Sequence, residues 1–188
     1  MIIITGLGNP GEQYKNTRHN VGFMAIDAFA GKNDFPEFKL QKKSHSLVSE
    51  HVVDGKPVLL AKPQTFMNES GKAIKQLTAQ KDSEVIVIHD DIDLPLGKLK
   101  IIKERGSAGH KGVESIIKSV GNDGLVRFRI GIGALTETPK DTKAMEIVLK
   151  SFSSEDQKII DETINKTVDA LVLYIIEGLE KAMNEYNK

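Results

Sequence analysis

The chain lacks cysteine entirely and carries no net formal charge at pH 7, with 26 basic and 26 acidic residues among 188. The absence of cysteine excludes disulfide bonds and thiolate chemistry and fits a reducing cytoplasm, where we expect the protein to reside. The charge balance excludes a globally basic nucleic-acid-binding protein. Apolar runs such as residues 2–4 and 101–102 are far too short to span a membrane, and no basic region precedes Ile2 as in a signal peptide. We therefore expect no association with a membrane.

The composition is that of an ordinary soluble protein, with 39% apolar and 28% charged residues. A length of 188 residues favours one domain, over residues 1–188, with a substantial core. Apolar patterns predict strands over residues 2–5, 84–88, 98–103 and 126–133, and Asp54-Gly55 predicts a hairpin between residues 45–53 and 57–61. These strands alternate with predicted helices. The order predicts an α/β fold, a mixed twisted β-sheet sandwiched between α-helices.

Helix ends are indicated by capping residues. Asn20 is expected to cap a helix that begins at Val21, and Asn68 or Ser70 to begin another. Shorter helices are expected over residues 113–120 and 143–149. Residues 153–156 resemble a capping box at the start of a long amphipathic helix, which Gly178 is placed to interrupt. Residues 31–41, 104–112 and 136–141 are expected to form loops.

Charge is distributed unevenly along the chain. Residues 98–129 contain eight basic and three acidic residues, whereas residues 153–188 contain eight acidic and four basic ones. A basic segment within a neutral protein is typical of a local phosphate-binding surface, and the alternative is an ordinary solvated face.

Residues 6–11 read GLGNPG after a predicted strand and match the G-x-G-x-x-G pattern of dinucleotide-binding proteins. That fingerprint requires a helix directly afterwards, but residues 12–17 show no apolar periodicity. The acidic residue near the expected distance, Asp27, falls inside a predicted helix instead of at a strand end. We therefore interpret the glycines as a tight turn that exposes the Asn9 side chain.

His19 lies in the polar segment TRHN, residues 17–20, and is a candidate general base. Asn9 follows the first predicted strand and Asp90 follows the strand over residues 84–88. Because the carboxyl ends of strands in open α/β sheets gather at one edge, these three side chains are expected to converge. A carboxylate on one imidazole nitrogen would fix the tautomer and leave the other nitrogen to accept a proton from water. The alternative is a solvated loop histidine.

Residues 89–93, HDDID, hold three carboxylates within four residues, which suits a hard cation. No glycine-bearing calcium loop and no second ligand cluster accompany them. The alternatives are a set of caps and turn-formers, or a carboxylate that orients a base. We predict neither a metal nor a cofactor.

Two further segments offer groups to a substrate. Phe66, Met67 and Asn68 lie at a loop-to-helix junction, where the amide either binds substrate or caps a helix. Residues 106–112, GSAGHKG, form either a phosphate-binding loop that includes Lys111 or a flexible turn. No serine has a G-x-S-x-G context, so water activated by histidine is the simpler chemistry.

Taken together, six segments resemble those of bacterial-type peptidyl-tRNA hydrolases, in the same order and at close to the same spacing. The resemblance implies a monomeric α/β enzyme that cleaves the ester between a peptide and the 3′ ribose of tRNA. The matching segments are residues 6–11 with Tyr14, 17–22, 63–71, 89–97, 106–117 and 127–133.

By that resemblance, His19 is the catalytic base and Asp90 the carboxylate that orients it. The remaining assignments fall into three groups: Asn9 and Asn68 as amides near the scissile ester, Tyr14, Phe66 and Met67 as the lining of the 3′-end and peptide site, and Arg129 as a tRNA phosphate contact. A local basic face on a neutral protein fits such a substrate.

The chain departs from the family at Lys111, where the family usually has Asn in the sequence Gly-His-Asn-Gly. An amide accepts hydrogen bonds and an ammonium group does not, so Lys111 implies different gating or a phosphate contact. A further basic position of the family is Ile102 here, with Lys103 beside it, and Lys103 and Lys111 are expected to contact the tRNA substrate. The alternative function is that of a related RNA-binding splicing protein that hydrolyses nothing, although the joint presence of the four candidate catalytic residues opposes it.

Overall fold

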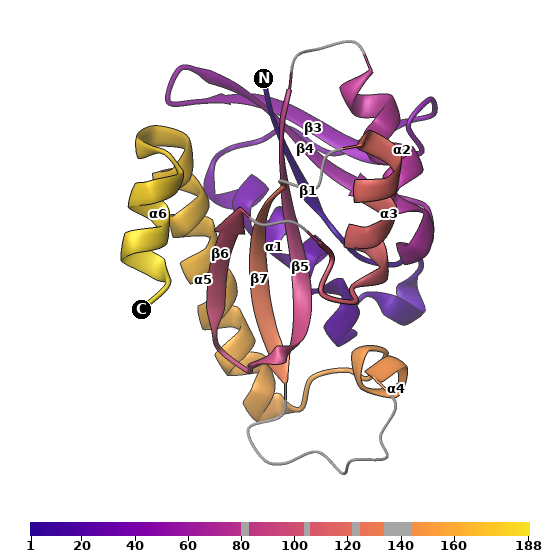
Figure 1. Cartoon of the computed structure of the whole chain (residues 1–188), viewed down its shortest axis with the longest axis vertical. Helices are drawn as coiled ribbons and strands as arrows, with labels where there is room; N and C mark the ends of the chain where they lie inside the picture. Colours follow the sequence, from indigo (N-terminus) through magenta and orange to yellow (C-terminus); the bar gives the residue numbers. More distant parts are fainter. Residues whose placement is uncertain (80–82, 104–105, 122–124, 134–143) are drawn as a thin grey trace.

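The computed structural model describes residues 1–79, 83–103, 106–121, 125–133 and 144–188 (Figure 1). The expected loop over residues 136–141 and the first residues of the loop 104–112 lie outside this part. Within it the chain forms one mixed sheet with helices on both faces, which confirms the predicted fold class.

The described part of the chain contributes seven strands to the sheet, in the order β2-β3-β4-β1-β5-β7-β6. The parallel pairs β1 with β4, β1 with β5 and β5 with β7 form its centre, and the pairs β2 with β3, β3 with β4 and β6 with β7 are antiparallel. The strands are β1 Ile2–Gly6, β2 Lys39–Gln41, β3 Ser46–Val53, β4 Lys56–Pro63, β5 Glu84–Pro95, β6 Leu99–Lys103 and β7 Val126–Gly133.

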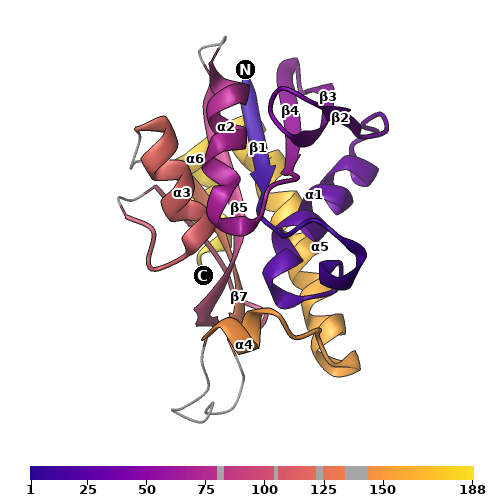
Figure 2. The ribbon, with the colours of Figure 1, turned by 90° about the vertical axis from the view of Figure 1, so that its right-hand side faces the viewer.

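Helices cover both faces of this sheet. Figure 2 shows α2 and α3 on one side and α1 and α5 on the other. The α-helices are α1 Val21–Lys32, α2 Ser70–Thr78, α3 Lys111–Val120, α4 Ala144–Val148, α5 Ser154–Glu177 and α6 Leu179–Tyr186, and the short 3-10 helices are η1 Glu12–Tyr14, η2 Arg18–Asn20 and η3 Met67–Glu69.

Side-chain alternation along the central strands divides the interior into two cores. On β1, Ile4 packs in the core beneath α1 and α5, whereas Ile3 packs beneath α2 and α3. On β5, Ile86 and Val87 divide in the same way. A buried strand therefore reads as an unbroken apolar run, which is why β1 and the start of β5 were predictable.

Three predicted features are corrected by the structure. The expected loop over residues 31–41 includes a short edge strand, β2, whose three residues are exposed and carry no apolar alternation. Strand β5 continues seven residues beyond the predicted end at 88, because Asp90 and Asp91 pair with β7 and stay in the sheet. Asn20 precedes α1 but makes no side-chain capping bond.

Other boundaries agree with the sequence. Ser153 Oγ accepts a hydrogen bond from Asp156 N at 3.1 Å, which is the cap expected there. Gly178, with φ of 91°, separates α5 from α6 as its position suggested. Helix α4 lies within the predicted residues 143–149.

The start of α1 approaches the sheet backbone to backbone. A Cβ atom at Gly22 would lie 2.5 Å from Ile88 O and 2.6 Å from Leu7 N, and one at Gly6 would lie 2.2 Å from Gly22 O. Only glycine fits these positions. The close approach brings η2, and with it His19, next to the end of β1 and the middle of β5.

Gly22→Ala should therefore lower the free energy of unfolding by about 1–3 kcal/mol, because the added methyl group forces α1 away from β1 and β5. Gly31→Ala in the same helix is the matched control: a Cβ there meets nothing within 4 Å, and the change should be neutral or stabilising by up to about 1 kcal/mol. Urea unfolding of both variants measures the difference, and equal stabilities would contradict the argument.

Candidate active site

A cleft of about 840 Å³ opens beyond the end of β1, alongside residues 89–93 in the second half of β5, and the start of α3, helix α4 and Leu149 form its other walls. Its lining includes every residue for which a catalytic or end-binding role was expected from the sequence. The residues are Asn9, Tyr14, His19, Phe66, Met67, Asn68, His89, Asp90, Asp91, Ile92, Asp93, Ser107, Ala108, Gly109, His110, Lys111, Met145, Val148 and Leu149.

His19 and Asp90 form a hydrogen-bonded pair on the floor of this cleft. His19 lies in η2 and Asp90 in β5, and the distance from His19 Nδ1 to Asp90 Oδ1 is 2.8 Å. The Asp90 side chain is only 3% exposed and that of His19 13%. With Nδ1 bound to the carboxylate, His19 Nε2 is the nitrogen left for a group in the cleft.

His110 binds the same carboxylate oxygen, with His110 Nε2 2.9 Å from Asp90 Oδ1. His110 also caps α3, because its Nδ1 accepts a hydrogen bond from Val113 N at 3.3 Å. A nitrogen that accepts carries no proton, so the proton of the neutral ring resides on Nε2 and is donated to Asp90. His110 falls in the loop expected over residues 104–112 and was given no role there; its place shortly before a predicted helix was the available signal.

Asp90 is an ionised carboxylate at neutral pH. Burial by itself raises the pKa of Asp90, but the His110 and His19 rings that donate to it hold that pKa well below its usual range. The negative charge on the floor of the cleft is therefore permanent at physiological pH.

His89 is a neutral ring behind this pair. Its Nδ1 donates to Asp90 O at 2.6 Å, and its ring centroid lies 4.5 Å from that of His110. Burial and the neighbouring His110 hold the pKa of His89 well below its usual range. The ring thus supports His110 without adding charge.

The loop that carries Asn9 is fixed by Asn20. Asn20 Oδ1 accepts from Asn9 N and Asn20 Nδ2 donates to Asn9 O, both at 2.9 Å. The Asn9 side chain in turn accepts from Met67 N through Oδ1, also at 2.9 Å, which leaves its NH₂ group for the cleft. Asn20 therefore clamps the Asn9 loop and does not cap the helix, which was not expected from the sequence.

The glycine turn leads into the three-residue helix η1, so it lacks the long helix that a dinucleotide site needs.

Asn68 does not cap α2, which contradicts one of its two interpretations. It is the middle residue of η3, it is exposed, and the residue at the cap position of α2 is Glu69. Phe66 beside it is 58% exposed although it is aromatic, whereas Met67 is buried. Together with the half-buried Tyr14, these residues form one wall of the cleft.

Helix α4 supplies an apolar wall that the sequence analysis did not anticipate. Met145, Val148 and Leu149 line the cleft, and Met145 and Leu149 are exposed. Exposed apolar side chains around a polar floor are typical of a ligand site.

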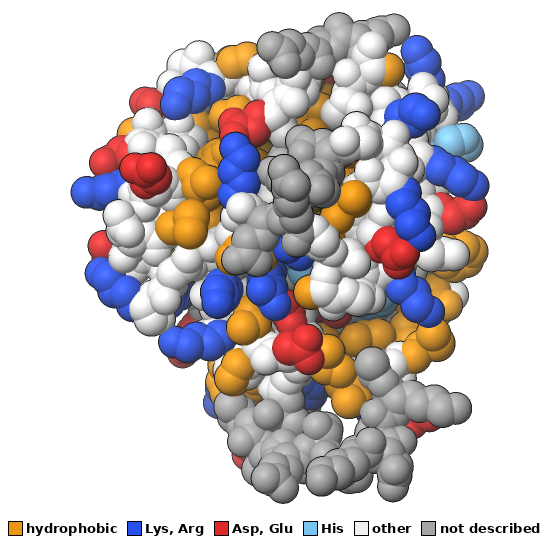
Figure 3. Space-filling view, viewed as in Figure 1, with side chains coloured by type: hydrophobic (Ala, Val, Ile, Leu, Met, Phe, Trp, Pro, Cys, Tyr) orange, Lys and Arg blue, Asp and Glu red, His pale blue; other side chains and the backbone are white. Residues whose placement is uncertain are grey.

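The three predicted tRNA contacts lie in different settings. Lys111 is the first residue of α3, exposed at the cleft, and Lys103 is exposed at the end of β6. Arg129 on β7 forms an ion pair with Asp91 and is largely buried. Figure 3 shows Lys and Arg side chains gathered over β6 and β7.

The acidic segment over residues 89–93 does not gather into the metal-binding cluster that was one of its alternative interpretations. Asp91 binds Arg129 and also accepts from Asp93 N at 2.9 Å, so it acts as an ion-pair partner and turn-former. Among the residues that the structure describes, the group that could jointly ligate a metal is instead His19, Asp90 and His110. Their possible ligand atoms lie within 4.8 Å of one another. The cap on α3 keeps the proton of His110 on the nitrogen that faces Asp90, so this geometry suits a hydrogen-bonded cluster.

The described helices include none with the length and apolar character needed to cross a membrane.

Comparison with known proteins places this arrangement in a family. The family model described as "Peptidyl-tRNA hydrolase" matches residues 3–188. The chain is 44% identical to the peptidyl-tRNA hydrolase of Thermodesulfovibrio yellowstonii over 193 residues, covering 100% of both, and 40% identical to that of Fervidobacterium nodosum over 186 residues, covering 99% of this chain and 96% of the relative. The crystal structure of peptidyl-tRNA hydrolase from Acinetobacter baumannii superposes with a TM-score of 0.91 at 29% identity, over 100% of this chain and 94% of the other.

Neutral His89 makes stability depend on pH. The pKa of His89 is lower in the folded state than in the unfolded state, where it is about 6.5. The contribution of the neutral ring to the free energy of unfolding is therefore complete above pH 6.5 and is lost as the pH falls below that value. As the pH falls from 6.5, the free energy of unfolding should decrease more steeply for the wild type than for His89→Gln, by up to about 1.4 kcal/mol per pH unit. Urea unfolding at pH 7.5, 6.5 and 5.5 tests this. Ile88→Val is the control, which should lower stability equally at each pH; parallel curves for the wild type and His89→Gln would refute the argument.

Proposed function

This chain belongs to the peptidyl-tRNA hydrolase family, and we propose on that premise that it hydrolyses the ester between a peptide and the 3′ ribose of tRNA. The reaction would recycle tRNA from stalled or aborted translation. The single observation that carries the proposal is the His19–Asp90 pair, with one imidazole nitrogen on a buried carboxylate and the other available to the cleft.

In the proposed reaction His19 Nε2 accepts a proton from water as the water oxygen attacks the ester carbonyl carbon. Asp90 keeps the Nδ1 proton in place and stabilises the cationic ring that forms. The tetrahedral intermediate collapses with cleavage of the bond to the 3′ oxygen, which takes the proton from His19. The products are the free peptide carboxylic acid and tRNA with a free 3′ hydroxyl group. An ester is already activated, so positioning and a general base suffice for this chemistry.

Substrate positioning would fall to the walls of the cleft. The NH₂ group of Asn9 and the amide of Asn68 are placed to hydrogen-bond the peptide and the ester. Phe66, Met67 and Tyr14 offer an apolar and aromatic surface for the tRNA 3′ end and the peptide.

We assign tRNA contacts to Lys103, Lys111 and Arg129. Lys103 and Lys111 are exposed and able to meet phosphate directly. Arg129 would contact a phosphate through its guanidinium group, which the ion pair with Asp91 orients. A local cationic face on a protein of zero net charge limits nonspecific RNA binding. We further propose that the enzyme is a cytoplasmic monomer.

A non-hydrolytic RNA-binding homologue is the alternative from another functional class. Such a protein would need the basic residues but not a fixed imidazole. The clamp of Asn20 on Asn9 and the two donors on Asp90 keep the groups needed for catalysis in place, and this favours the enzyme.

The deciding experiment incubates the protein with N-blocked aminoacyl-tRNA and, separately, with unblocked aminoacyl-tRNA. We expect release of the blocked amino acid only, with His19→Ala reducing kcat by about 10²–10⁴-fold and leaving the circular dichroism spectrum unchanged. Asp90→Asn should also lower kcat, because it removes the charge that stabilises the cationic ring. Full turnover by His19→Ala would remove His19 from the mechanism, and tRNA binding without cleavage by the wild type would support the alternative.

Lys111 allows a separate test of the tRNA contacts. If its ammonium group meets a phosphate, Lys111→Asn should weaken tRNA binding at low salt and reduce the slope of log K against log salt concentration by about 0.7–0.9. Lys32→Asn, a change in the last turn of α1, is the control. Equal slopes for the wild type and Lys111→Asn would assign Lys111 to the ester site or to no contact.

A further inference from the structure

The residue directly before the proposed base is joined to three separate parts of the chain. Arg18 Nη1 donates to Ile132 O at 3.1 Å, near the end of β7, and Nη2 donates to Asp156 Oδ2 at 2.6 Å, in the first turn of α5. The guanidinium carbon lies 4.9 Å from the centre of the Phe152 ring. The Arg18 side chain is 15% exposed and that of Asp156 25%, so this ion pair is partly shielded from solvent.

The main chain of the same segment is fixed as well. Arg18 N donates to Lys150 O at 3.0 Å, and Thr17 forms an isolated antiparallel bridge with Ser151. Asp156 is the residue that would complete a capping box with Ser153, yet its carboxylate binds Arg18. The first turn of α5 therefore supports the His19 segment through this carboxylate.

These anchors enclose the part of the chain that carries α4. Ile132 lies before that part, and Lys150 and Phe152 lie after α4, so Arg18 contacts both of its ends. Helix α4 itself packs against η2 and supplies Met145 and Val148 to the cleft, and Leu149 directly after it also lines the cleft. One side chain thus connects the segment of the base with the apolar wall opposite it.

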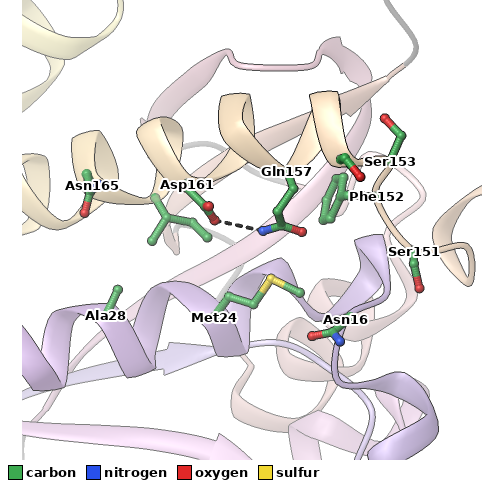
Figure 4. Close-up of a pocket in the computed structure, with 11 residues that line it drawn as sticks. Asn16, Met24, Ala28, Ser151, Phe152, Ser153, Gln157, Asp161 and Asn165 are labelled. Atoms are coloured by element: carbon green, nitrogen blue, oxygen red, sulfur yellow. Dashed lines mark hydrogen bonds between the residues drawn. The ribbon is translucent and has the colours of Figure 1, made fainter.

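Apolar packing supports this region as well, because the partly buried Met24, Val148 and Phe152 pack against the core, but it leaves a groove beside them. A groove of about 730 Å³ separates α1 from the first turns of α5, with Met24 and Ala28 on one side and Gln157 and Asp161 on the other (Figure 4). Figure 4 also shows Ser151 facing Asn16, two residues before Arg18. The groove leaves this end of the α1–α5 interface open, and beside it the side chain of Arg18 joins η2 to the first turn of α5.

We propose that Arg18 is a positioning residue for the hydrolysis, which holds His19 and the α4 wall in a fixed relation to each other. The inference rests on the proposed function, because it assigns to Arg18 the alignment of the base with the substrate bound along α4. Guanidinium suits the task, since its planar donors bond a carboxylate and a carbonyl in different directions at once.

The test compares Asp156→Asn and Arg18→Lys with a control ion pair. Asp156→Asn removes the charge that anchors the guanidinium, and Arg18→Lys removes the planar fork. Each should lower kcat for N-blocked aminoacyl-tRNA by on the order of 10- to 100-fold, because a small misplacement of a base is costly. Asp169→Asn breaks the exposed pair between Lys32 and Asp169, which also joins α1 to α5, and should leave kcat unchanged.

An NMR readout separates positioning from general destabilisation and from failure of the proposed function. In Asp156→Asn the ring signals of His19 and the methyl signal of Met145 should shift, while those of His51 and Met183 stay in place. Wild-type kcat together with unmoved His19 and Met145 signals would overturn the inference, as would a loss of activity that only follows the unfolded fraction. Absence of hydrolysis by the wild type would instead refute the proposed function, which the NMR signals do not depend on.

Discussion

One oxygen atom of Asp90 organises the site, because it accepts hydrogen bonds from two imidazoles that come from different parts of the chain. A carboxylate that is 3% exposed is costly to bury unless donors replace its water. Here the donors are His19 from η2 and His110 from the start of α3. The ionised group is therefore stable only when β5, η2 and α3 are all in place, so that assembly of the fold and assembly of the site are the same event.

The backbone geometry that permits this contact lies one helix turn away. Gly22 lets α1 rest against β1 and β5 at distances that a methyl group would occupy, and this fixes where η2 meets the end of β5. Asn20 then joins η2 to the loop after β1, and Arg18 joins it to β7 and α5. Three consecutive residues, Arg18 to Asn20, thus serve the same site through three different contacts. This explains why the polar segment between two apolar stretches carries so much of the sequence signal.

Local sequence patterns were sufficient to predict most strands and helices. Buried strands appear as continuous apolar runs and amphipathic helices as apolar residues repeated every three to four positions, and both patterns are visible within a short stretch of sequence. The meeting of His19 with Asp90 followed from a general rule about strand ends. The clamp of Asn20, the second donor His110 and the pair of Arg129 with Asp91 were not predictable, since each depends on a distance between elements or on the register of β5 against β7. Strand β2 was missed because an exposed edge strand has no buried face to leave a pattern.

The charges around the cleft suit a substrate whose scissile ester lies close to phosphate. Three carboxylates line the cleft: Asp90 on the floor is covered by the rings that donate to it, Asp91 is paired with Arg129, and Asp93 is exposed. His89 adds no charge. The N-terminus of α3 points its positive pole to the same region, and Lys111 stands at its first residue. At the cleft a polyanion is therefore attracted by Lys111 and the N-terminus of α3 and repelled by the exposed Asp93, whereas Asp90 is buried. Because Lys111 lies on α3 and the second donor to Asp90 caps that same helix, the proposed phosphate contact and the carboxylate bound to the proposed base are held in register by one element.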